Sequence, residues 1–194
     1  MEIRSFLAFE LPEEIKGIIS AVSGELKKSS LNIRWVKVSN VHLTVTFMGN
    51  ISSLVLEQMI RPISDVCLDY GPFNIAIKGM GVFSNRRNPR VLWIGLDGDM
   101  ERLAHFRDTL QNRLSPFGIK GEKRPFNPHL TLGRFRKGLK PGVRPDDILM
   151  EYDNLTSPVC PLNELILLKS DLKPDGAIYT KLSAWPLTGD KLRN

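Results

Sequence analysis

The sequence is poor in the residues and runs that define several common classes of protein. Of its 194 residues, three are histidine and two are cysteine. Cys67 and Cys160 do not have a metal-binding spacing, and a reducing compartment would keep them as thiols. No apolar run approaches the roughly 20 residues that a membrane-spanning helix needs. No Gly-rich segment ends in Lys-Ser or Lys-Thr, which excludes a P-loop nucleotide site.

The first residues, MEIRSFLAFELPEE, contain only a short apolar stretch. No basic segment precedes it and no small-residue cleavage site follows it, so it predicts a first strand rather than a secretory signal. We therefore expect a cytoplasmic protein without membrane association. The net charge is +6, from 27 basic and 21 acidic residues. Such a surplus suits a polyanionic partner, and it suits solubility alone equally well.

The hydrophobic pattern alternates between strands and helices along the whole chain. It predicts strands at 3–10, 33–38, 41–48, 73–83, 90–97, 128–135, 162–172 and 177–187, and helices at 12–26, 52–68, 99–114 and 145–152. Pro62 should kink or interrupt the second helix, because proline lacks a backbone donor and clashes with the preceding turn. No long linker divides the chain, so residues 1–194 are expected to form a single domain.

One tripeptide, His-Leu-Thr, occurs twice and uses two of the three histidines. It opens HLTVTFMG at His42 and HLTLGRFR at His129, 87 residues apart. The same shift places the strand at 3–10 on that at 90–97, and the first helix on that at 99–114. The pattern predicts an internal duplication, approximately 1–87 and 88–194, with two pseudo-symmetric lobes that face each other across a cleft.

The spacing within each motif has a structural meaning, because residues i and i+2 of a strand point to the same face. His42 then shares a face with Thr44, and His129 shares a face with Thr131. Two such strands in one cleft would bring together two imidazoles and two hydroxyls. Imidazoles titrate near neutral pH, so one can act as a base while the other acts as an acid. This set suits in-line attack of water on a phosphodiester.

Arg134 follows the second motif inside a basic cluster at 134–137. It is expected to hold the non-bridging phosphate oxygens together with the threonines, and the alternative is a solvated charge at a strand end. Metal catalysis is the chemical alternative, since histidine is a common ligand. Neither motif contains Asp, Glu or Cys, so we expect no metal and no cofactor. His105 has no partner motif and is interpreted as structural.

With these paired motifs the chain resembles the two-histidine (H-x-T-x) phosphoesterases, and among them the RNA 2′,3′-cyclic phosphodiesterases, also called 2′-5′ RNA ligases. The resemblance extends from RSFLAFELP and IRWVKVSNVHLTVTFMG through FNPHLTLGRF to LLKSDLKPDGAIYTKL. It implies a bilobal α+β fold, with an antiparallel sheet and helices in each lobe and the active cleft between them. The first motif departs mildly, with Thr-Phe-Met-Gly where the family often has Lys-Phe-Leu-Gly.

The resemblance also implies residue roles. His42 would be the proton donor to the leaving 3′ oxygen, and His129 the proton acceptor that activates water. Thr44, Thr131 and Arg134 would bind the phosphate. The implied reaction opens a 2′,3′-cyclic phosphate at an RNA end to a 2′-phosphate, with 2′-5′ RNA ligation as a side activity, in a protein that we expect to be a monomer.

Two other functions stay open from the sequence. The first is a non-catalytic RNA-binding protein, against which the intact histidines and threonines argue. The second is a phosphodiesterase that acts on a small nucleotide, such as ADP-ribose cyclic phosphate, instead of an RNA end.

Overall fold

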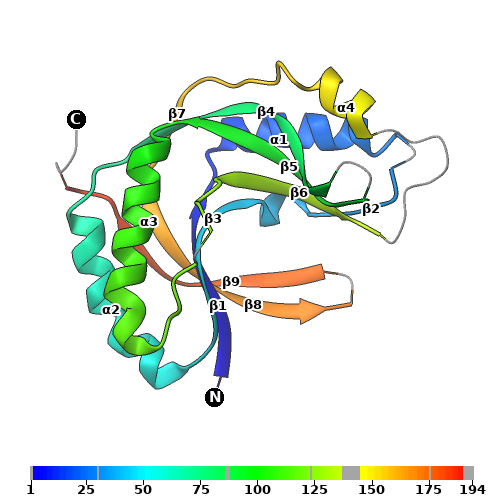
Figure 1. Cartoon of the computed structure of the whole chain (residues 1–194). Coiled ribbons are helices and arrows are strands. Elements are labelled where there is room, and N and C mark those ends of the chain that lie inside the picture. Colours follow the sequence, from blue (N-terminus) through cyan, green and yellow to red (C-terminus); the bar gives the residue numbers. More distant parts are fainter. Residues whose placement is uncertain are drawn as a thin grey trace.

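The computed structural model describes residues 2–29, 31–85, 88–122, 124–136, 145–174 and 176–189 (Figure 1). Its strands and helices follow one another as β1 (Glu2–Glu10), α1 (Glu13–Leu26), β2 (Ile33–Trp35), the 3-10 turn η1 (Val38–Asn40), β3 (His42–Ser52), α2 (Ser53–Leu68), β4 (Phe73–Asn85), β5 (Asn88–Gly98), α3 (Met100–Leu114), the 3-10 turn η2 (Ser115–Phe117), β6 (His129–Phe135), α4 (Pro145–Glu151), β7 (Cys160–Leu162), β8 (Glu164–Lys173) and β9 (Gly176–Pro186).

The strands form one sheet in the order β7-β4-β5-β6-β3-β1-β8-β9, with β2 paired beside β6. Its pairings are antiparallel. The sheet is narrowest between β3 and β6, where Leu43 and Leu130 are the paired residues in the described part of the chain. This seam divides the sheet into a first lobe (β3, β1, β8, β9) and a second lobe (β6, β5, β4, β7, β2).

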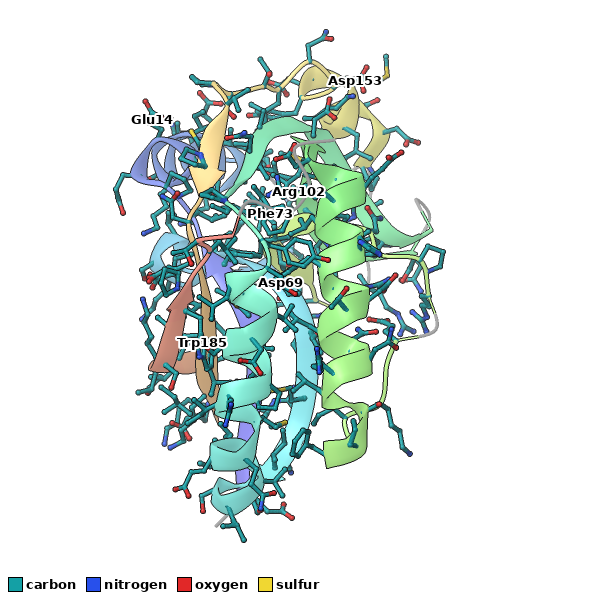
Figure 2. The ribbon with its side chains drawn as sticks, turned by 90° about the vertical axis from the view of Figure 1, so that its left-hand side faces the viewer. Glu14, Asp69, Phe73, Arg102, Asp153 and Trp185 are labelled. Atoms are coloured by element: carbon teal, nitrogen blue, oxygen red, sulfur yellow. The ribbon has the colours of Figure 1, made fainter. Side chains whose placement is uncertain are left out.

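Each lobe carries its own helices. In Figures 1 and 2, α2 and α3 lie side by side on the first lobe. The ring of Phe106 on α3 lies 5.2 Å from that of Phe73, the first residue of β4, so α3 also contacts the second lobe. α1 and α4 accompany the second lobe (Figure 1). Tyr152, just after α4, donates a hydrogen bond to Glu25 of α1 at 2.9 Å. One continuous cluster of buried apolar side chains runs through both lobes, and the α+β bilobal fold expected from the sequence is confirmed.

Two local predictions differ from the structure. Pro62 is expected to kink or interrupt the helix at 52–68, and the interruption does not occur, since α2 is one helix from Ser53 to Leu68. Its buried face includes Met59 and Ile63 on either side of the proline, and burial of such side chains contributes about 1.5–3 kcal/mol each, enough to offset the lost hydrogen bond. The strand expected at 33–38 ends at Trp35 and is followed by η1.

The order of the sheet is symmetric about the seam. Strands related by the shift of 87 residues occupy equivalent places: β3 and β6 at the seam, β1 and β5 next to them, and β8 and β4 beyond. The lobes nevertheless differ from the two halves of the sequence, since β4 pairs with β5 and β8 pairs with β1. The duplication at 1–87 and 88–194 stays a proposal, and residues 86–87 at its boundary lie outside the described part.

Candidate active site

The seam between the lobes places both His-Leu-Thr motifs on one surface. Leu43 and Leu130 are paired across it and are fully buried. Their neighbours along each strand therefore point to the opposite face. In an antiparallel pair with this register, His42 lies beside Thr131 and Thr44 beside His129. The cavity on that face is lined by all four, as the spacing within the motifs predicts.

This cavity is a cleft of about 980 Å³ between the lobes. Its walls come from β1, β3 and β6, from the segment of β2 and η1, and from the hairpin of β8 and β9. Among the described residues that line it, every charged side chain is basic: Arg4, Arg34, Lys37, Arg134 and Lys173. The cleft thus offers an anion two imidazoles, two hydroxyls and a cationic rim.

Both imidazoles are oriented in the same way. The Nδ1 atom of His42 lies 2.8 Å from the carbonyl oxygen of Asn40, and that of His129 lies 2.8 Å from the carbonyl oxygen of Asn127. A carbonyl oxygen can only accept, so each Nδ1 carries a proton and donates it. Nε2 is then the atom left for chemistry in each ring. Asn40 and Asn127 are themselves 87 residues apart, a match that extends the repeat to Asn-x-His-Leu-Thr and that we missed in the sequence.

Aromatic rings enclose His42. The ring centroid of Phe6 lies 4.8 Å away, and Tyr179 meets the imidazole edge-on at 5.2 Å. Burial among these rings lowers the pKa of His42 below the usual 6.5, because it disfavours the charged form. The hydrogen bond to Asn40 opposes this effect, and the charge on His129 adds to it. The two histidines are therefore electrostatically coupled.

Aromatic rings also surround His129. Phe83 meets it edge-on at 4.6 Å, and Trp93 lies 6.4 Å away between ring centroids. Burial again lowers the pKa of His129, the hydrogen bond to Asn127 raises it, and the nearby positive charge of Arg134 lowers it further. Arg134 thus favours the neutral form of His129, which is the form that a base needs.

Arg134 reaches the cleft because β6 contains a bulge. Strict alternation from Thr131 would turn Arg134 to the other face of the sheet. The register shifts, however, since Leu92 and Trp93 are consecutive on β5 but pair with Gly133 and Thr131 on β6. The extra residue brings Arg134 back to the side of the motif, where it lines the cleft. A Cβ at Gly133 would lie 2.4 Å from a methyl group of β2, so the close approach of β2 to β6 depends on glycine.

The third histidine has another environment. His105 is an exposed residue of α3, and its Nδ1 lies 3.5 Å from the hydroxyl of Tyr70. It does not line the cleft. Both cysteines are free and buried, and burial raises the pKa of Cys67 to about 12.

The part of the chain that the structure describes contains no group of three or more His, Cys, Asp or Glu side chains arranged to hold a metal ion. Within the same residues, none of the helices combines the length and apolar character needed to cross a bilayer.

Known proteins are similar to this chain in sequence and in fold. The model of the 2′-5′ RNA ligase superfamily matches residues 11–174. The RNA 2′,3′-cyclic phosphodiesterase of Methanothermobacter thermautotrophicus is 31% identical over 187 residues, which cover 96% of this chain and 100% of that protein. The crystal structure of TT0787 of Thermus thermophilus matches with a TM-score of 0.80 and 25% identity, over 97% of this chain and 100% of that one. E. coli LigT complexed with 3′-AMP shares the fold with a TM-score of 0.74 and 23% identity, over 97% and 99%.

A bilobal α+β fold with two facing His-x-Thr strands defines the class of the two-histidine phosphoesterases. Within that class, the chain belongs to the 2′-5′ RNA ligase superfamily. The resemblance stated from the sequence is thereby confirmed, and so is the prediction that the chain is an enzyme.

Proposed function

We propose that this enzyme hydrolyses the 2′,3′-cyclic phosphate at RNA ends to a 2′-phosphate, by acid–base catalysis between His42 and His129. The observation that carries the proposal is the pair of imidazoles on one face of the seam, each held through Nδ1 so that Nε2 stays available. Relatives that match nearly the whole chain are named RNA 2′,3′-cyclic phosphodiesterase.

In the proposed step, one histidine removes a proton from the attacking water and the other gives a proton to the leaving oxygen. Nε2 of neutral His129 takes a proton from water, and the water oxygen forms a bond to phosphorus. The bond from phosphorus to the 3′ oxygen breaks, and protonated His42 gives its proton to that oxygen. Solvent then resets both rings. The hydroxyls of Thr44 and Thr131 and the guanidinium of Arg134 bind the non-bridging oxygens, where charge is held during the displacement.

The assignment of the base to His129 has electrostatic support. The positive charge of Arg134 disfavours the imidazolium form of His129. Burial, the largest effect on both rings, disfavours the imidazolium form of each and does not distinguish them. The position of Arg134 therefore favours His129 as the neutral base and leaves His42, on the other strand, as the acid.

The rate should depend on pH as a bell, because one imidazole must be neutral and the other protonated. The pKa values of both rings lie below the usual 6.5. In the free enzyme, activity falls at low pH when His129 becomes protonated and falls at higher pH when His42 loses its proton. The maximum of kcat/KM is therefore expected on the acid side of 6.5, in a profile measured with a cyclic-phosphate substrate. A flat profile, or a maximum above pH 8, would contradict this.

Product analysis tests the proposed function itself. An RNA oligonucleotide with a terminal 2′,3′-cyclic phosphate is incubated with the enzyme in EDTA, and the product is separated by chromatography against 2′- and 3′-phosphate standards. We expect full conversion to the 2′-phosphate, since imidazole, hydroxyl and guanidinium groups supply the acid, the base and the anion-binding donors without a Lewis acid. The His42→Ala/His129→Ala enzyme, purified identically, controls for contaminating nucleases. Activity that disappears in EDTA and returns with a divalent ion would overturn the metal-independent mechanism.

Ligation follows from the same step. If the 5′-hydroxyl of a second RNA replaces water as the nucleophile, the new bond is a 2′-5′ phosphodiester and the 3′ oxygen still leaves. We propose this as a side activity, because water in the cleft competes with the 5′-hydroxyl at far higher concentration.

We also propose that the protein acts as a monomer, since a single chain supplies both motifs. As the sequence predicts, we place it in the cytoplasm.

The lining of the cleft suits a nucleotide better than a bare phosphate. Phe47 lines it and is 62% exposed. An exposed aromatic ring beside a phosphate site can stack a nucleobase without regard to its identity. This supports a nucleotide end as the substrate and leaves the sequence of the RNA unrestricted.

A further inference from the structure

We infer that Arg34 forms a second phosphate-binding position beside Arg134, which holds the phosphodiester on the 5′ side of the reacting cyclic phosphate. The inference rests on the proposed function and extends it, because it selects an oligonucleotide end over a mononucleotide as the preferred substrate.

The position of Arg34 follows from strand pairing. β2 runs antiparallel to β6, and Arg34 is the direct partner of Arg134. Directly opposite residues of an antiparallel pair project to the same face, with Cβ atoms about 4.5–5.5 Å apart. Both arginines line the cleft. Two guanidinium groups are thus adjacent on the surface that also presents His129.

Such a pair is unfavourable without an anion, since like charges placed directly opposite each other destabilise a sheet. Within the described residues, neither Arg34 nor Arg134 forms an ion pair with a carboxylate. The described charged residues that line the cleft are all basic. The repulsion is relieved when two phosphate groups, one for each guanidinium, enter the cleft together.

Arg34 is also held in place from across the cleft. Its Nη2 donates to the carbonyl oxygens of Pro174 at 2.5 Å and Lys173 at 3.4 Å, which belong to the end of the β8–β9 hairpin. A guanidinium has five N–H donors in a rigid fork. These contacts occupy one nitrogen, so Nη1 and Nε keep donors for an oxyanion. The hairpin therefore orients the group without consuming its capacity for phosphate.

The chemistry of the substrate identifies the second phosphate. A 2′,3′-cyclic phosphate ends the RNA on its 3′ side, so the neighbouring phosphate of the same strand lies on the 5′ side. A mononucleotide such as 2′,3′-cyclic AMP has a 5′-hydroxyl there and lacks that charge. With Arg134 on the cyclic phosphate, Arg34 is the adjacent cation available for the phosphodiester that precedes it.

The test compares kcat/KM for 2′,3′-cyclic AMP with that for the dinucleotide ApA carrying a terminal 2′,3′-cyclic phosphate. We expect Arg34→Met, which keeps the length of the side chain, to reduce kcat/KM for the dinucleotide roughly 10–100-fold, the worth of one charge-assisted contact. The loss for the mononucleotide should be several-fold smaller, and Arg34→Lys should restore part of the difference. The dinucleotide reaction should also become less sensitive to ionic strength, because one contact between opposite charges is lost.

Arg113→Met is the matched control, because Arg113 is an exposed arginine of α3 that does not line the cleft. It should leave both substrates unchanged. An equal loss on both substrates with Arg34→Met would overturn the inference and reduce Arg34 to a support for the hairpin, and unchanged kinetics would overturn it altogether. The Kd of ApA 2′-phosphate, measured by calorimetry for the wild type and Arg34→Met, tests the site without turnover. If the wild type processes neither substrate but Arg34→Met still weakens this complex, the proposed function fails and the phosphate position stands.

Discussion

Replacement of His42 or His129 by alanine is expected to slow the hydrolysis of a terminal 2′,3′-cyclic phosphate by roughly 10²–10⁴, the usual contribution of a positioned acid or base. His42→Ala removes the group that protonates the leaving 3′ oxygen. His129→Ala removes the group that takes the proton from water. The measurement is the single-turnover rate at saturating enzyme, which separates the chemical step from product release.

The double variant distinguishes one catalytic unit from two independent contributions. Because both rings act on the same phosphate in the same step, His42→Ala/His129→Ala should be little slower than either single variant. His105→Ala is the control and should keep nearly full activity, since His105 is exposed on α3 and does not line the cleft. If His105 proves essential while either motif histidine is dispensable, the paired-motif mechanism fails and the repeat is only architecture.

Arg134→Ala is expected to cost about 1.5–3 kcal/mol of transition-state binding, the usual worth of a hydrogen bond to a charged group. This corresponds to roughly a 10–150-fold loss in kcat/KM. A second effect follows from charge. Arg134 lowers the pKa of His129, so its removal should raise that pKa and move the acid limb of the pH profile to higher pH.

Arg136→Ala is the matched control for this variant. Arg136 is exposed and belongs to the same basic cluster, but it does not line the cleft. Thermal unfolding of both variants should stay close to that of the wild type, because both side chains are exposed. Unchanged kinetics for Arg134→Ala would identify Arg134 as a solvated surface charge.

The four motif residues could be predicted from the sequence because their geometry is local. The alternation of a strand fixes that His42 and Thr44 share a face, and the repeat of the tripeptide indicates that a second strand presents the same pair. The match between Asn40 and Asn127 was equally visible as an extension of the repeat. Its role was not, because the contacts to the imidazoles are made by backbone carbonyls, which any residue possesses.

The place of Arg134 depends on contacts that no local pattern contains. Its side chain lines the cleft only because β6 gains a residue relative to β5, and such a bulge is set by pairing between strands far apart in the sequence. The place of β8 has the same origin, because β8 pairs with β1 from the other end of the chain. Hydrophobic periodicity predicts that a segment is a strand but not which strand it pairs with. The three-residue strand β7 is too short to show any period.

The central claim is that both motif histidines face one phosphate, and NMR tests it most directly. The chain has three histidines, so their imidazole signals can be followed through a pH titration with and without adenosine 2′-phosphate. An anion favours the charged form of a nearby imidazole. We predict that the ligand raises the pKa of both His42 and His129, and that the imidazole signals of His105 do not respond to the ligand. A ligand that moves one motif histidine alone, or neither, would contradict the account.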